Sequence, residues 1–140
     1  LLEKETLEEF RFLLNYKFDS VSPMAVVLVG QTELWENKLK LQRYAAIRQR
    51  IDMYCTLPHL DRSETEQYIG SHMAYSGCSQ EVFTQRAVDE IHKASAGIPR
   101  MINRVCEKAL MYAFQQQKRL VDDYMIKFVT EHEMLTITTK

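Results

Sequence analysis

The second half of the chain places apolar residues at helical spacing in four successive segments. Their expected spans are residues 63–77, 84–97, 99–117 and 121–134. Ser63 and Glu66 have the spacing of a capping box, and Thr84 is a favourable N-cap residue. Pro99 suits the first turn of a helix, where its missing N–H is not needed. We therefore predict a four-helix bundle over residues 61–134.

The first 60 residues instead combine helical segments with two short apolar runs. Residues 4–15 have the periodicity of an amphipathic helix. Residues 24–30 form a continuous run rich in β-branched side chains, which is typical of a strand buried on both faces of a parallel sheet. Residues 51–57 alternate with period two and predict a second strand. Between the two runs, a helix that begins near Thr32 and breaks near residues 38–42 precedes a short helix ending in arginines.

Two strands of a buried sheet leave their own edges and faces unsatisfied, so we expect further strands that this sequence does not contain. The predicted fold class is a mostly helical α/β remnant, in which two short buried-type strands of a truncated parallel sheet precede an all-α four-helix bundle. The expected domains are residues 1–60 and 61–134, with a frayed tail at residues 135–140. The chain begins without Met inside a helical pattern, from which we expect the back part of a larger protein.

Composition narrows the class of protein without naming a function. Lys and Arg number 18 against 19 Asp and Glu, a formal net charge of -1, so no overall field attracts nucleic acid or an anionic membrane. No apolar run approaches the roughly 18 residues of a membrane span, and residues 1–9 lack the pattern of a signal peptide. Cys55, Cys78 and Cys106 lack metal-ligand spacing. We expect a cytoplasmic protein with reduced thiols, no metal site and no membrane contact from this segment.

The tetrapeptide from Gly97 to Arg100 joins two predicted helices. Glycine is suited to the end of the first helix and Pro99 to the start of the second. A helix N-terminus favours anions, because its first amide hydrogens are unpaired and the macrodipole is positive there. Arg100 is therefore a candidate phosphate contact, and the alternative is a solvated residue after an ordinary helix-turn-helix.

Three further polar residues occupy positions where a functional and a structural interpretation both remain open. Gln31 follows the first predicted strand, at the end of a sheet where ligands bind in open α/β folds, but it can equally cap the next helix. Arg48 and Arg50 end a short helix, where positive charge is favourable. Arg50 is also close enough in sequence to form a salt bridge with Asp52.

Four segments, taken in order and spacing, carry a resemblance to a known family. They are Leu1 to Asn15, Val26 to Leu34, Gln49 to Ile51 and Gly97 to Asn103. The pattern resembles the carboxyl-terminal half, from sensor 1 to the helical lid, of a P-loop ATPase of the AAA+ class. More narrowly, it is similar to the bacterial type found in general secretion pathway protein A (ExeA-like) and in transposition helper ATPases.

The resemblance implies a role for each candidate residue. Gln31 matches the sensor 1 position near the γ-phosphate or the attacking water. Arg50 matches an arginine finger that reaches a neighbouring subunit's nucleotide, with Arg48 as the alternate, and Arg100 matches sensor 2. Residues 1–60 would then be the last part of the α/β core and residues 61–134 the lid. The intact protein is expected to bind ATP and Mg²⁺, to form a ring, and to remodel a secretion-complex protein or a transposase.

The sequence departs from this family in one important respect. No GxxxxGK[ST] motif occurs among its glycines, which are Gly30, Gly70, Gly77 and Gly97, and no apolar run ending in Asp-Glu precedes Leu1. The chain alone is therefore expected to bind no nucleotide cofactor and to hydrolyse no ATP.

Two hypotheses from other functional classes also stand. A helix-turn-helix within residues 84–117, with Arg100, Arg104 and Lys108 on its second helix, would make this a DNA-binding helical domain. Alternatively, the helical bundle is a protein-interaction module. The apolar character of the second helix and the slightly acidic chain count against DNA binding.

Overall fold

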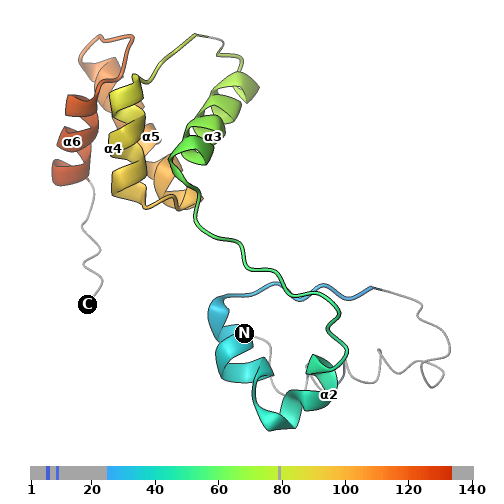
Figure 1. The fold of residues 1–140 in the computed structure, drawn as a ribbon. Coiled ribbons are helices and arrows are strands. Elements are labelled where there is room, and N and C mark those ends of the chain that lie inside the picture. The colour runs from blue at the N-terminus through green and yellow to red at the C-terminus, as the bar shows by residue number, and fades with distance from the viewer. Residues whose placement is uncertain (1–5, 7–8, 10–24, 79, 134–140) are drawn as a thin grey trace. The chain divides into compact units, whose positions relative to one another are not determined.

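The computed structural model describes residues 6, 9, 25–78 and 80–133, and the chain forms two compact units (Figure 1). Unit 1 covers Leu1–Thr56 and unit 2 covers Leu57–Lys140. Most of the helix predicted at residues 4–15 lies outside the described residues, although Thr6 and Glu9 are both helical. The tail predicted at residues 135–140 also lies outside them.

Unit 2 is a bundle of four helices, as the apolar periodicity predicts. Its helices are α3 (Arg62–Tyr75), α4 (Gln85–Ser95), α5 (Pro99–Gln115) and α6 (Asp123–His132). α4, α5 and α6 pack against one another, and α3 packs against α4 and α5 (Figure 1). One core fills the space between them, formed by Ile69, Phe83, Ala87, Val88, Ile91, Ile102, Val105, Ala109, Ala113, Val121, Met125, Ile126 and Val129. The repeated burial of residues three and four apart explains why these segments are helices.

The helix caps agree with the sequence at α4 and disagree at α3. The Thr84 hydroxyl accepts a hydrogen bond from the N–H of Ala87 at 3.1 Å, which confirms the predicted N-cap. The predicted capping box of Ser63 and Glu66 is wrong, because the box is formed by Asp61 and Glu64 instead. α3 therefore begins at residue 62.

Backbone hydrogen bonds join the chain just before α4 to the chain just before α6. Phe83 and Val121 form an isolated parallel bridge, in which Val121 donates to the carbonyl of Val82 and accepts from the N–H of Thr84. Asp122, the next residue, caps α6 by accepting from the N–H of Met125 at 3.0 Å. α4 and α6 thus start side by side and run in the same direction (Figure 1).

Between residues 25 and 56, unit 1 contains three short helices. They are the π-helix η2 (Leu34–Leu39), the 3-10 helix η3 (Gln42–Tyr44) and α2 (Ala45–Arg48). The break near residues 38–42 is confirmed by a turn at Lys40 between η2 and η3. Leu39, Tyr44 and Ile47 are buried together, and Leu28, Leu34, Trp35 and Ile51 pack against them.

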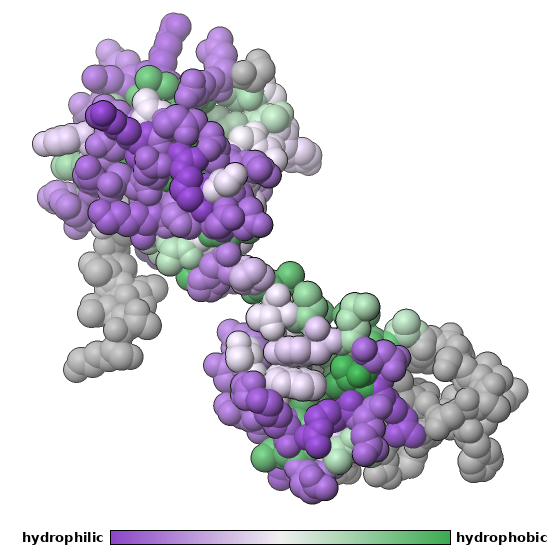
Figure 2. Space-filling model, in the orientation of Figure 1, coloured by the Kyte–Doolittle hydropathy of each residue, from purple (hydrophilic) through white to green (hydrophobic). Residues whose placement is uncertain are grey.

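Neither predicted strand has a pairing partner among residues 25–78 and 80–133, where the isolated Phe83–Val121 bridge is the sole bridge outside helices. A strand exists only when a neighbouring strand takes up its backbone hydrogen bonds, so apolar pattern alone is insufficient. Val27 and Val29 are 82% and 86% exposed, and Met53 is 85% exposed. Only some of the apolar side chains in these runs are therefore covered. Leu28, for example, packs against the unit 1 core. Figure 2 shows apolar surface, in green, on unit 1.

Candidate functional site

Arg100 lies at the start of α5, in the position that its sequence context predicts. α4 ends at Ser95, and the next two residues, Ala96 and Gly97, have φ values of +50° and +72°. Pro99 is the first residue of α5, so Arg100 lies in the first turn. Its side chain is exposed and makes no hydrogen bond or ion pair within the described ranges 25–78 and 80–133. An exposed guanidinium at a helix N-terminus is free to meet an anion.

The turn in front of Arg100 is held by its own hydrogen bonds. The buried hydroxyl of Ser95, a residue that is 2% exposed, accepts from the N–H of Gly97 at 3.3 Å. Its carbonyl accepts from the N–H of Ile98 at 3.0 Å. The carbonyl of Ile98 then accepts from the N–H groups of Met101 and Ile102. These hydrogen bonds hold the turn against the first turn of α5.

Cationic side chains continue along α5 from Arg100. Arg104 and Lys108 follow at intervals of four residues, which places all three cations along one side of the helix. None of the three forms an ion pair with a described residue. Ile102 and Val105 are buried on the opposite side. The apolar residues of α5 therefore do not block an anion-binding surface, and the DNA-binding hypothesis stays a prediction.

Arg48 and Arg50 both contact helix carbonyls within unit 1. The Arg48 guanidinium donates to the carbonyls of Leu39 and Lys40 at 3.2 and 2.8 Å, at the end of η2. Arg50 donates to the carbonyl of Ala46 at 3.0 Å, near the end of α2. These contacts match the expectation that arginines favour the negative ends of helices. Neither contact tests the arginine-finger role.

Gln31 lies just before η2, where the helical turn of unit 1 begins. Its backbone carbonyl accepts from the N–H of Leu34 at 2.9 Å. Its side chain is exposed, and no side-chain cap hydrogen bond forms at the start of η2. Glu33 is the N-cap residue of η2. The sensor 1 role of Gln31 stays a prediction. Gln31, Arg48 and Arg50 belong to unit 1 and Arg100 to unit 2.

A polar network between α3 and α4 was not foreseen from the sequence. Arg62 donates to Asp89 at 2.7 Å, contacts Glu66 and reaches the side chain of Gln85 at 2.7 Å. The Gln85 amide and then Arg62 hold the pKa of the Glu66 carboxyl below its ordinary value. The spacing of Arg62 and Glu66 by four residues is the one local signal for this network. The contacts to Asp89 and Gln85 depend on how α3 packs against α4.

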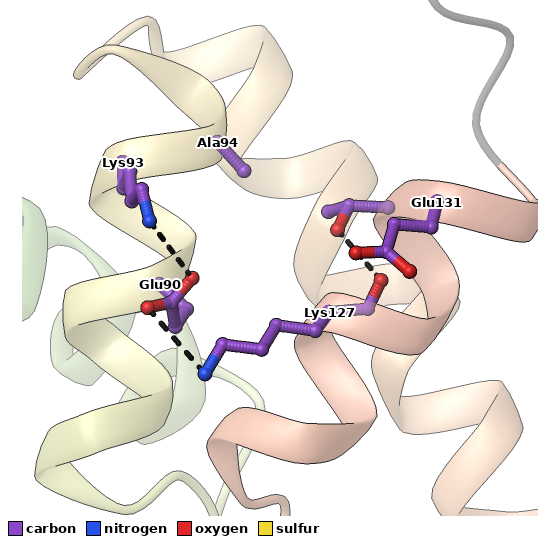
Figure 3. A pocket seen from close by; sticks show the side chains of 6 residues that line it. Glu90, Lys93, Ala94, Lys127 and Glu131 are labelled. Atoms are coloured by element: carbon purple, nitrogen blue, oxygen red, sulfur yellow. Dashed lines mark hydrogen bonds and ion pairs between the residues drawn. The ribbon is translucent and has the colours of Figure 1, made fainter.

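A shallow charged hollow lies between α4 and α6 (Figure 3). Glu90 interacts with Lys93 and with Lys127, each at 3.8 Å, and so joins the two helices. Hydrogen bonding to Asp123 and the charge of Glu90 raise the pKa of Lys127. Opposite charges line the hollow and neutralise one another. The hollow therefore resembles an interhelical ion-pair network more than a ligand site.

The three cysteines differ in exposure. Cys55 is exposed, whereas Cys78 and Cys106 are partly buried, and all three are free thiols. Burial raises the pKa of the Cys106 thiol to about 12. Within the described part of the chain, no group of three or more His, Cys, Asp or Glu side chains is arranged so that it could hold a metal ion. None of the helices described is long and apolar enough to span a bilayer.

Comparison with known proteins shows similarity to a secretion-pathway protein. No protein-family model matches the chain, and no solved structure is significantly similar to it. Over 108 residues, 77% of this chain, it is 36% identical to general secretion pathway protein A of Aeromonas hydrophila. That match covers 20% of the relative, so the chain spans about one fifth of its length. The chain is thus similar to one segment of a secretion-pathway protein.

Proposed function

We propose that this chain is the sensing and lid part of an AAA+-type ATPase of the secretion pathway, and that Arg100 contacts the γ-phosphate of ATP. ATP and Mg²⁺ would be held mainly by residues outside this chain, because the sequence has no GxxxxGK[ST] loop. The nucleotide would supply the phosphate charge, and Arg100 would distinguish ATP from ADP. Hydrolysis would then be coupled to remodelling of a secretion-complex partner.

The observation that carries the proposal is the state of Arg100. An exposed arginine without a partner in the described residues, placed on a hydrogen-bonded turn at a helix N-terminus, suits a phosphate oxygen. The similarity to general secretion pathway protein A supports the secretion pathway over transposition.

The unpaired apolar runs of unit 1 support a larger α/β core. Val27, Val29 and Met53 expose more than four fifths of their surface. Strands of a parallel sheet are normally covered on both faces. Further strands and helices of the intact protein would cover these side chains, and would bring the phosphate-binding loop with them.

Nucleotide affinity of the intact protein tests the role of Arg100. Arg100→Ala is expected to weaken ATP binding about 10- to 150-fold and ADP binding much less, because a charge-assisted hydrogen bond to the γ-phosphate contributes about 1.5–3 kcal/mol. The measurement is isothermal titration with ATP and with ADP in the presence of Mg²⁺.

Arg86→Ala is the matched control, since Arg86 is also an exposed arginine of unit 2 and makes no hydrogen bond or ion pair with a described residue. It should leave both affinities unchanged. Equal losses for ATP and ADP in Arg100→Ala would contradict the proposal, as would no loss at all.

A further inference from the structure

The chain that enters α3 crosses the turn between α4 and α5 with backbone against backbone. The N–H of Leu60 donates to the carbonyl oxygen of Gly97 at 3.0 Å. A Cβ atom on Gly97 would lie 1.9 Å from the carbonyl oxygen of Leu60, far inside van der Waals contact. Gly97 also has a φ of +72°, which favours glycine. The close approach therefore requires glycine at this position.

Both sides of this contact are anchored within unit 2. The Leu60 side chain packs against the core of the bundle, and Asp61, the next residue, caps α3. On the other side, Gly97 is buried and donates to the buried hydroxyl of Ser95. The contact thus joins the start of α3 to the turn that leads into α5.

We propose that Leu60 and Gly97 form a backbone clamp through which the connector at residues 57–60 positions Arg100. Arg100 follows Gly97 by three residues, and the carbonyl of Ile98 between them holds the first turn of α5. A shift of the connector therefore moves the start of α5 and the guanidinium with it. Leu60 and Gly97 are positioning residues, and their effect on nucleotide sensing rests on the function proposed for Arg100.

Gly97→Ala in the intact protein tests the clamp. Loss of the Leu60 hydrogen bond is expected to speed exchange of the Leu60 amide about tenfold, with faster exchange also at Met101 and Ile102. The preference for ATP over ADP should fall by the same factor as in Arg100→Ala. Combining Gly97→Ala with Arg100→Ala should cause no further loss, because both changes remove one interaction. Hydrogen exchange with mass spectrometry and nucleotide titration provide the two measurements.

Gly77→Ala is the matched control. Gly77 has a similar φ of +81°, but a Cβ there has nothing within 4 Å. Gly77→Ala places alanine at an unfavourable positive φ, as Gly97→Ala does, but its Cβ meets no neighbouring atom. The exchange rate of the Leu60 amide and the preference for ATP over ADP should therefore remain unchanged. Should Gly97→Ala fail to fold, Leu60→Ala keeps the glycine and removes the side-chain anchor of the connector, with the same direction of effect expected.

The outcomes separate the clamp from the proposed function. If Arg100→Ala leaves the ATP preference unchanged, the proposed function fails, and the exchange rates alone still decide whether the clamp holds the first turn of α5. If Arg100→Ala removes the preference and Gly97→Ala retains it, the clamp does not position Arg100. A Leu60 amide that exchanges as fast in the original protein as in Gly97→Ala overturns the clamp itself.

Discussion

At the scale of single residues, Cys106 shows how burial controls a titratable group. It lies on α5, and neighbouring atoms remove most of the water that would solvate a thiolate. Burial raises the pKa of its thiol from 9.0 to about 12. Because the folded state then binds its proton more tightly than the unfolded chain does, the stabilisation is complete below pH 9 and is lost as pH rises toward 12.

We predict that Cys106→Ala flattens the alkaline loss of stability. Between about pH 8 and about pH 10.5, the original protein should lose on the order of 2 kcal/mol more in its free energy of unfolding than the variant does. Urea unfolding at both pH values measures the difference. Cys55→Ala serves as the control, because Cys55 is exposed. Identical slopes for the original protein and Cys106→Ala would show that Cys106 makes no contribution to the pH dependence.

At the scale of elements, the start of α3 is decided by contacts from elsewhere in the fold. The sequence predicts the capping box at Ser63 and Glu66, but the structure forms it with Asp61 and Glu64, which have the same spacing. Leu60 is tied to Gly97, so the chain enters the helix immediately after it and Asp61 becomes the cap. Glu66, the acid of the other box, contacts Arg62 and Gln85 instead.

Alanine substitutions at Asp61 and at Ser63 are expected to change the free energy of unfolding by different amounts. Asp61→Ala should reduce the free energy of unfolding by about 1 kcal/mol, because it removes the side chain that accepts from the N–H of Glu64. Ser63→Ala should change it by no more than about 0.5 kcal/mol, since Ser63 is exposed on the helix. Thermal and urea unfolding of the two variants measure both values. A larger loss for Ser63→Ala would reverse the assignment of the cap.

The helices were predictable because their signals are local. Apolar periodicity, Thr84 and Pro99 lie within the segments they describe, and α4 and α5 begin where these residues indicate. The strands were not, because pairing depends on chain that lies far away in sequence. For the candidate site, the position of Arg100 followed from its helix start, whereas the Leu60–Gly97 contact and the Arg62 network join distant residues.

At the scale of the whole molecule, the two units differ in how completely they bury apolar surface. Unit 2 has a continuous core that draws on all four helices. The described part of unit 1 has three buried apolar residues and leaves Val27, Val29 and Met53 exposed. A small core of this kind contributes little against the conformational entropy of the chain.

We therefore predict that a polypeptide of residues 57–140 folds by itself. It should show helical circular dichroism and a single cooperative urea transition, because every core residue that the structure describes for this bundle lies within unit 2. Residues 1–56 alone should show no cooperative transition. An unfolded 57–140 polypeptide, measured under the same conditions, would mean that unit 2 depends on the rest of the chain.

Because of the bridge between Phe83 and Val121, the position of α6 does not depend on the length of the loop that precedes it. Val121 is held by hydrogen bonds to Val82 and Thr84, so α6 starts at a point set by α4 and not by residues 116–120 that lead to it. Insertions or deletions in that loop would change its contour without shifting α6 along α4. The ion pair of Glu90 with Lys127 should therefore keep its register when the length of this loop changes.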